Sequence, residues 1–190
     1  MTYQSPNDSL FFFDMMRSIQ ILTWEFIQNL PLVAGLILAL QFWRQEQWGT
    51  AVATIMAGSI IGSLLIRFTE AKIVTKRREP ISVTITNIIV MSLLMLAVVA
   101  YVNASWSNWQ VDLIVGALGG ALLSAAQNLA AKKRIGVKHM LAFVFAFSVA
   151  LIVIRTLVDI LPTVATILLI TIIVTVVISL VDYDLLRSHT

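Results

Sequence analysis

Long apolar stretches alternate along the chain with short segments rich in charge, proline or tryptophan. Six of these stretches approach the roughly 20 helical residues that are needed to cross about 30 Å of hydrocarbon. None has the alternating polarity of a membrane β-barrel strand. The pattern predicts an all-α polytopic membrane protein, a six-transmembrane-helix bundle. The expected spans are 26–43, 48–68, 81–102, 111–131, 139–158 and 161–181.

The composition supports a membrane protein. Of the 190 residues, 59% are hydrophobic and 12% are charged, and the mean hydropathy is +0.92. Soluble domains carry about 25% charged residues. A soluble chain of this composition would expose large apolar patches and aggregate.

The basic residues indicate an orientation. Nine of the thirteen Lys and Arg lie in the segments 67–78 and 132–138. Basic loops stay on the cytoplasmic side, so six spans place both termini in the cytoplasm and favour the plasma (inner) membrane. We expect the basic loops to attract anionic lipids. Clustering in loops is not typical of a nucleic-acid face, so no nucleic-acid partner is expected.

The chain divides into an N-terminal segment (1–25), a six-helix transmembrane domain (26–181) and a short cytoplasmic tail (182–190). Residues 10–24 have the pattern of an amphipathic helix lying in the membrane interface. The alternative is that they extend the first span, with a kink at Pro31.

The second and fourth spans resemble each other. A shift of 58 residues superposes Trp48 on Trp106, and it superposes Gly58 and Gly62 of the second span on Gly116 and Gly120 of the fourth. Both spans run into a basic loop. The repeat predicts a parallel duplication of the first hairpin.

Both spans carry small residues at four-residue spacing, which are Thr54, Gly58 and Gly62 in the second and Gly116 and Gly120 in the fourth. Such stripes let helix backbones approach closely, so we expect them to pack helices. A polar path along the fourth helix is the alternative interpretation.

Two polar groups are candidate substrate or pore-lining residues. Asp112, Arg155 and Asp159 share an outer layer and are able to pair. We favour a structural clamp between the fourth and fifth helices, or side chains that simply extend to water at the membrane edge, over an outer gate. The second group lies in the inner half. It lines a hydrated cavity or forms hydrogen bonds between helices, and it consists of Asn87, Ser124, Gln127 and Asn128.

Several kinds of chemistry are not expected. The chain has no cysteine, no acidic residue near the middle of a span and no spacing typical of metal ligands. We therefore predict no cofactor, no metal site and no enzyme activity. Two functions remain. The first is permeation or small-solute transport, by a homo-oligomer or with a partner subunit. The alternative is a non-catalytic assembly, anchoring or regulatory subunit of a larger complex.

Overall fold

The computed structural model describes the backbone of residues 6–69, 81–104, 108–131 and 137–187. Within these ranges the chain forms six α-helices joined by short connections, so the all-helical prediction is confirmed for the described residues. The helices are α1 (Pro6–Arg44), α2 (Trp48–Thr69), α3 (Ile81–Val102), α4 (Trp109–Ala131), α5 (Val137–Leu157) and α6 (Thr163–Arg187).

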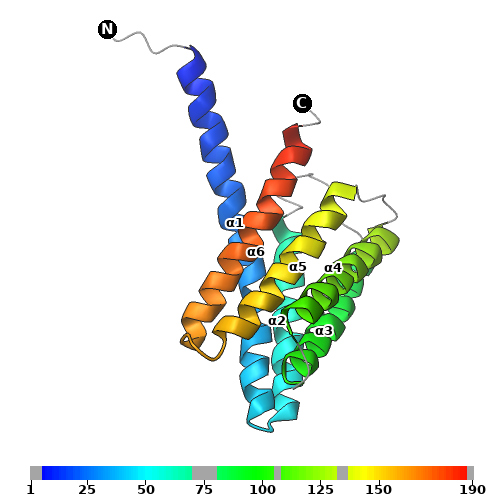
Figure 1. Ribbon diagram of the computed structural model, residues 1–190. Coiled ribbons are helices and arrows are strands. Elements are labelled where there is room, and N and C mark those ends of the chain that lie inside the picture. The colour runs from blue at the N-terminus through cyan, green and yellow to red at the C-terminus, as the bar shows by residue number, and fades with distance from the viewer. Residues whose placement is uncertain (1–5, 70–80, 105–107, 132–136, 188–190) are drawn as a thin grey trace.

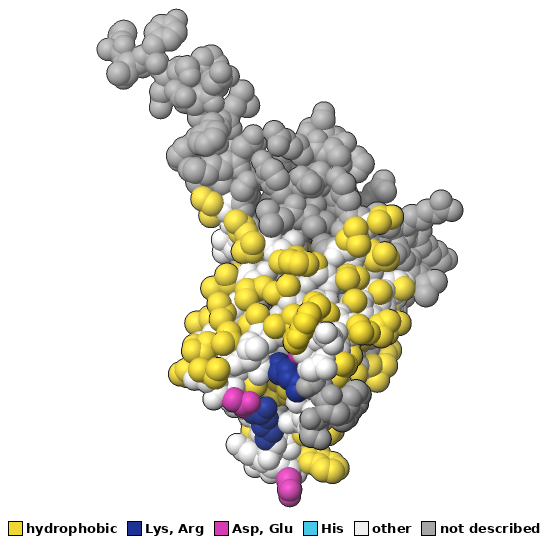
Figure 2. All heavy atoms as spheres, viewed as in Figure 1, with side chains coloured by type: hydrophobic (Ala, Val, Ile, Leu, Met, Phe, Trp, Pro, Cys, Tyr) yellow, Lys and Arg dark blue, Asp and Glu magenta, His cyan; other side chains and the backbone are white. Residues whose placement is uncertain are grey.

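Four helices are long and apolar enough to be candidate membrane spans. These are Leu22–Arg44, Trp48–Phe68, Ile81–Val102 and Trp109–Ala126, in α1 to α4. The described parts of α5 and α6 contain shorter apolar stretches, Phe143–Leu157 and Thr163–Ser179. The large side chains on the outside of the bundle are mainly hydrophobic (Figure 2). A helical surface of this kind suits a lipid environment.

The helices run up and down, and each packs against its neighbours in sequence, while α6 returns to pack against α1. The start of α1 and the end of α6 therefore lie at the same end of the bundle (Figure 1). The connections α1–α2 and α5–α6 lie at the opposite end (Figure 1).

The first helix is continuous over 39 residues and passes through Pro31. Its first turns project beyond the other helices (Figure 1). Continuity agrees with the interpretation that residues 10–24 extend the first span. Their position on a membrane surface stays a prediction.

Helix α2 packs against α1 through glycines. A Cβ added at Gly58 would lie 2.7 Å from the carbonyl oxygen of Pro31. A Cβ at Gly35 would lie 3.1 Å from the carbonyl oxygen of Thr54. At Gly62 it would meet the side chain of Leu32, at 2.5 Å. At Gly58 the two backbones are so close that only glycine fits without movement of the chain, whereas at Gly62 the Leu32 side chain would have to move.

Helix α4 packs against α5 in the same way. A Cβ at Gly116 would lie 2.4 Å from the Cα of Ser148, and one at Gly120 would lie 2.5 Å from the carbonyl oxygen of Phe143. The packing interpretation therefore accounts for these glycines.

The partners of these glycines do not confirm the predicted duplication. Gly58 lies against the helix that precedes its own, whereas the superposed Gly116 lies against the helix that follows its own. In a parallel duplication of the first hairpin, both would contact the preceding helix.

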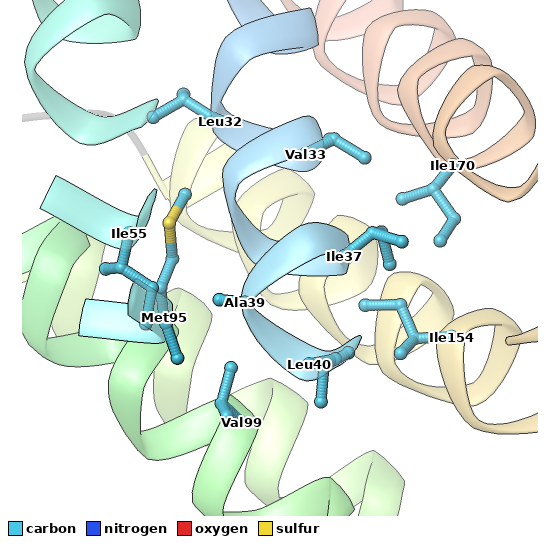
Figure 3. Close-up of a cluster of buried hydrophobic side chains, with 11 residues drawn as sticks. Leu32, Val33, Ile37, Ala39, Leu40, Ile55, Met95, Val99, Ile154 and Ile170 are labelled. Atoms are coloured by element: carbon cyan, nitrogen blue, oxygen red, sulfur yellow. The ribbon is translucent and has the colours of Figure 1, made fainter. Parts of the chain in front are cut away.

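A hydrophobic cluster surrounds the second half of α1 (Figure 3). In lipid such a cluster is held mainly by close packing, because lipid tails are as apolar as leucine. It joins α1 to α2, α3, α5 and α6. Its residues are Leu32, Val33, Ile37, Ala39, Leu40, Ala51, Ile55, Met95, Val99, Ile154 and Ile170.

Candidate functional site

Two regions of the bundle differ in their polar side chains. The ion-pair end is the end that contains Arg44, Asp112, Arg155 and Asp159. The basic-loop half is the opposite half, in which α2 and α4 run toward the basic sequence segments. Among the side chains that Figure 2 colours by type, those of Lys, Arg, Asp and Glu lie away from the grey atoms, next to a mainly hydrophobic surface.

Asp112 is the buried centre of the ion-pair end, with 2% of its surface exposed. Its Oδ1 atom accepts a hydrogen bond from the Tyr101 hydroxyl at 2.9 Å. The same atom accepts one from Nη1 of Arg155 at 3.1 Å. The carboxylate thus joins α3, α4 and α5. The predicted pairing of Asp112 with Arg155 is present.

Local structure fixes the position of Asp112. The side-chain oxygen of Asn108 accepts hydrogen bonds from the backbone N–H groups of Gln110 and Val111, at 3.1 and 3.0 Å. Asn108 therefore caps α4 and sets its first turn. An acidic side chain in a first turn also interacts favourably with the helix dipole.

Asp159 does not join this cluster. It forms an ion pair with Arg44 at the end of α1. Nε of Arg44 also donates to the side-chain oxygen of Asn103 at 3.3 Å, and the Asn103 amide donates to the backbone oxygen of Val99 at 2.7 Å. Arg44 thus connects α1, the end of α3 and the α5–α6 connection.

Further contacts of α1 lie at this end. The Gln41 amide donates to the hydroxyl of Thr163, at the start of α6. The rings of Trp43 and Trp48 stack across the α1–α2 turn, with centroids 5.5 Å apart and planes inclined by 8°. The turn itself places Glu46 at a φ of 59°.

Three buried hydroxyls among the described residues of the half that includes the ion-pair end, those of Ser148, Thr166 and Thr171, have partners. The Ser148 hydroxyl lies 2.8 Å from the backbone oxygen of Val144 and 3.2 Å from that of Leu113, so its single hydrogen is shared between these two acceptors. Thr166 and Thr171 bond to backbone oxygens four residues earlier in α6 or just before it.

The basic-loop half is different. Six buried side-chain oxygens of the described residues have no hydrogen-bond partner, and they lie in this half or at the middle of their helices. They belong to Ser63, Thr84, Asn87, Ser92, Ser124 and Ser179. A buried polar atom without a partner costs about 1–3 kcal/mol, so such atoms are uncommon in native proteins.

Contacts between helices show at which level along the bundle these unpartnered oxygens lie. The Ser59 hydroxyl of α2 lies 3.7 Å from the sulfur of Met95 on α3. Ser63 and Ser92 each lie about one turn further toward the basic-loop half, so they are at similar depth. At about this level the Asn29 amide of α1 contacts the Thr175 hydroxyl of α6, at 3.5 Å.

Several predicted site residues are now located. Asn87 is 8% exposed, and Ser124 is fully buried. Ser124 follows Gly120 by one turn on α4, the helix that packs on α5. Gln127 and Asn128 lie in α4 but outside the residues whose side chains the structure describes.

Sequence reasoning missed Arg44 and Tyr101 as partners of the acidic residues. It also missed the unpartnered hydroxyl of Thr84. The signal for Tyr101 was available, because it ends the third span at the depth where Asp112 begins the fourth. Among the described residues, no group of three His, Asp or Glu could hold a metal ion.

No family model, curated protein or solved structure matches this chain. A function must therefore be argued from the chain's own geometry.

Proposed function

We propose that the protein is an integral membrane protein for permeation or small-solute transport, in which all six helices cross the bilayer. The observation that carries the proposal is the set of unpartnered, buried oxygens in the basic-loop half. Buried polar atoms of this kind are normally satisfied by water or a ligand. A hydrated path that enters from the basic-loop end would satisfy them.

The other half supports a closed end for this path. The hydrophobic cluster around α1 surrounds Ile37 and Leu40, both fully buried. Beyond it lie the paired charges of the ion-pair end. We propose that the path is open toward the cytoplasm and closed toward the outside, with both termini and the basic loops cytoplasmic.

The chain offers a direct test because it lacks cysteine. Single cysteines introduced into the protein would have no background of native thiols. We would express Ser63→Cys, Asn87→Cys and Ser124→Cys in membranes and measure their reaction with a charged methanethiosulfonate reagent. Such reagents react with the thiolate, which forms only where water reaches the side chain.

Matched controls lie on the same helices at similar depth. Ile89 and Leu122 are 54% and 60% exposed on the hydrophobic outside, where lipid would surround them. We expect Asn87→Cys and Ser124→Cys to react well above Ile89→Cys and Leu122→Cys. Equal, negligible labelling at all four positions would contradict a hydrated path.

Flux provides the functional test. Purified protein in liposomes would be assayed for small ions, glycerol, urea and amino acids, beside protein-free liposomes. Passage of any of these above the control supports the proposal. If none of these solutes passes, although the introduced cysteines are labelled, the hydrated region is a binding site and the permeation function is contradicted.

The second candidate is a non-catalytic assembly, anchoring or regulatory subunit. The glycines favour it, because Gly58 of α2 and Gly116 and Gly120 of α4 lie where an added Cβ would meet the backbone of a neighbouring helix. This function needs a membrane partner or a second copy. Native mass spectrometry after mild solubilisation tests it, and a lone monomer would contradict it.

A further inference from the structure

We propose that the Arg44–Asp159 ion pair is a releasable latch that closes the ion-pair end of the bundle. The proposal rests on the permeation function, because a latch matters only if a path lies behind it. Its basis is the position of this pair between two tightly packed helix pairs, the α1–α2 pair and the α4–α5 pair.

The helices of each pair are held together at their backbones. At Gly58 there is no room for a Cβ between α1 and α2, and at Gly116 there is none between α4 and α5. Helices in such close contact cannot slide without a clash. Each pair therefore moves as one unit.

The two ion pairs differ in what they join. Asp112 and Arg155 both belong to the α4–α5 pair, so their contact stays intact when the helix pairs separate. Arg44 belongs to the α1–α2 pair. Asp159 follows α5 directly, and the backbone bonds from Val158 to Ile154 and from Leu161 to Leu157 continue the helical pattern around it. The Arg44–Asp159 contact thus connects the two units.

The two ion pairs also differ in how far their side chains are exposed to water, and this decides which of them can open. The side chain of Asp112 is 3% exposed, and its pairing cannot be broken without leaving a charge buried. The side chains of Arg44 and Asp159 are 38% and 63% exposed. Water can solvate both when they part, and exposed pairs contribute little to stability. A contact that must open repeatedly needs this property.

Charge reversal tests the latch without knowledge of the solute. A reporter cysteine replaces Thr166, which is fully buried one turn inside α6, and its labelling by a membrane-impermeant maleimide is timed. Arg44→Asp and Asp159→Arg each place like charges together. We expect each to increase the labelling rate by about two- to fivefold, which is the range that the loss of an exposed pair implies.

The double variant, Arg44→Asp with Asp159→Arg, restores opposite charges. Its labelling rate should return to within about twofold of the parent. Glu46→Gln is the control, because it removes a charge close to Arg44 without changing either residue of the latch. This variant should be labelled at the same rate as the parent. Single reversals that label like the parent, or a double reversal that fails to restore the rate, would overturn the latch.

A cross-link provides a second measurement that does not depend on charge-reversed protein folding. Arg44→Cys and Asp159→Cys together would be joined by a short bismaleimide, and flux would be compared before and after linking. The latch predicts at least a tenfold loss of flux on linking. Undiminished flux in fully linked protein overturns the latch and leaves the permeation function standing. No flux in the parent counts instead against the permeation function.

Discussion

The ion-pair end and the basic-loop half are built from the same helices, but they differ in whether their buried polar atoms have hydrogen-bond partners. At the ion-pair end the Asp112 carboxylate accepts hydrogen bonds from Tyr101 and Arg155. In the basic-loop half, hydroxyl and amide oxygens are buried without partners. The difference teaches that polar groups of the described residues are buried in two ways, with hydrogen-bond partners at the ion-pair end and, for six oxygens, without them in the basic-loop half or at the middle of the helices.

The strongest way to break this comparison is to disrupt the α4–α5 contact that both regions share. Gly116→Ala would place a Cβ 2.4 Å from the Cα of Ser148, where backbone must move. We expect a loss of about 3 kcal/mol in the free energy of unfolding, measured by thermal unfolding in detergent. Gly49→Ala is the control, since nothing lies within 4 Å of its added Cβ. Equal stability of the two variants would refute the backbone contact.

The next effect concerns the buried carboxylate. Asp112→Leu removes the carboxylate that accepts hydrogen bonds from the Arg155 guanidinium and the Tyr101 hydroxyl. We expect a loss of about 2 kcal/mol, below the value for a fully buried pair, because Arg155 is 27% exposed. Adding Arg155→Met should recover part of it, since no unpaired charge then remains. If the second change adds to the first, the pair does not couple the two helices.

A matched serine comparison sharpens the contrast between paired and unpaired oxygens. Ser148→Ala removes a hydroxyl that donates to Leu113 across the α4–α5 contact, and should cost about 1 kcal/mol. Ser124→Ala removes an unpartnered hydroxyl, so its stability in detergent should be unchanged or raised. Equal losses in chemical or thermal unfolding would mean that the Ser124 hydroxyl has a stabilising partner.

The smallest effect is in the α1–α2 turn. Gln47 N–H bonds to the Phe42 oxygen at 2.9 Å and Glu46 N–H to the Trp43 oxygen at 3.0 Å, which is a Schellman motif with Glu46 in the left-handed region. Glycine adopts this conformation without strain. Glu46→Gly should therefore raise the stability by about 0.5 kcal/mol. A lower melting temperature would show that the Glu46 side chain itself stabilises the turn.

Much of the fold follows from the sequence. The expected span of residues 81–102 coincides with α3, and the end expected at Trp43 lies one residue before that of α1. Charged residues and tryptophans mark the ends of membrane-spanning helices, so the ends of these spans can be predicted from the sequence. The Asp112–Arg155 pairing can also be predicted from the sequence, because opposite charges at the same depth in adjacent spans attract each other.

The partners of Asp159 and of the α4 glycines could not be read from the sequence. Arg44 reaches Asp159 because α1 packs against α6, a contact between the two ends of the chain. Likewise, the glycine spacing on α4 indicates a packing face but not which neighbour it meets. Both depend on the arrangement of helices around the bundle, which a single sequence does not encode in any local pattern.

The length of α1 has a mechanical consequence. At 39 residues it measures about 58 Å, nearly twice the hydrocarbon thickness. Its candidate span, Leu22–Arg44, accounts for the part inside the bundle, which leaves an arm of about 24 Å from Pro6 to Ile21. Arg44 lies at one tip of this rod and the arm at the other. A tilt of a few degrees at the ion-pair end would therefore move the far tip by several ångströms, so a fluorophore attached there would register motion at the opposite end of the helix.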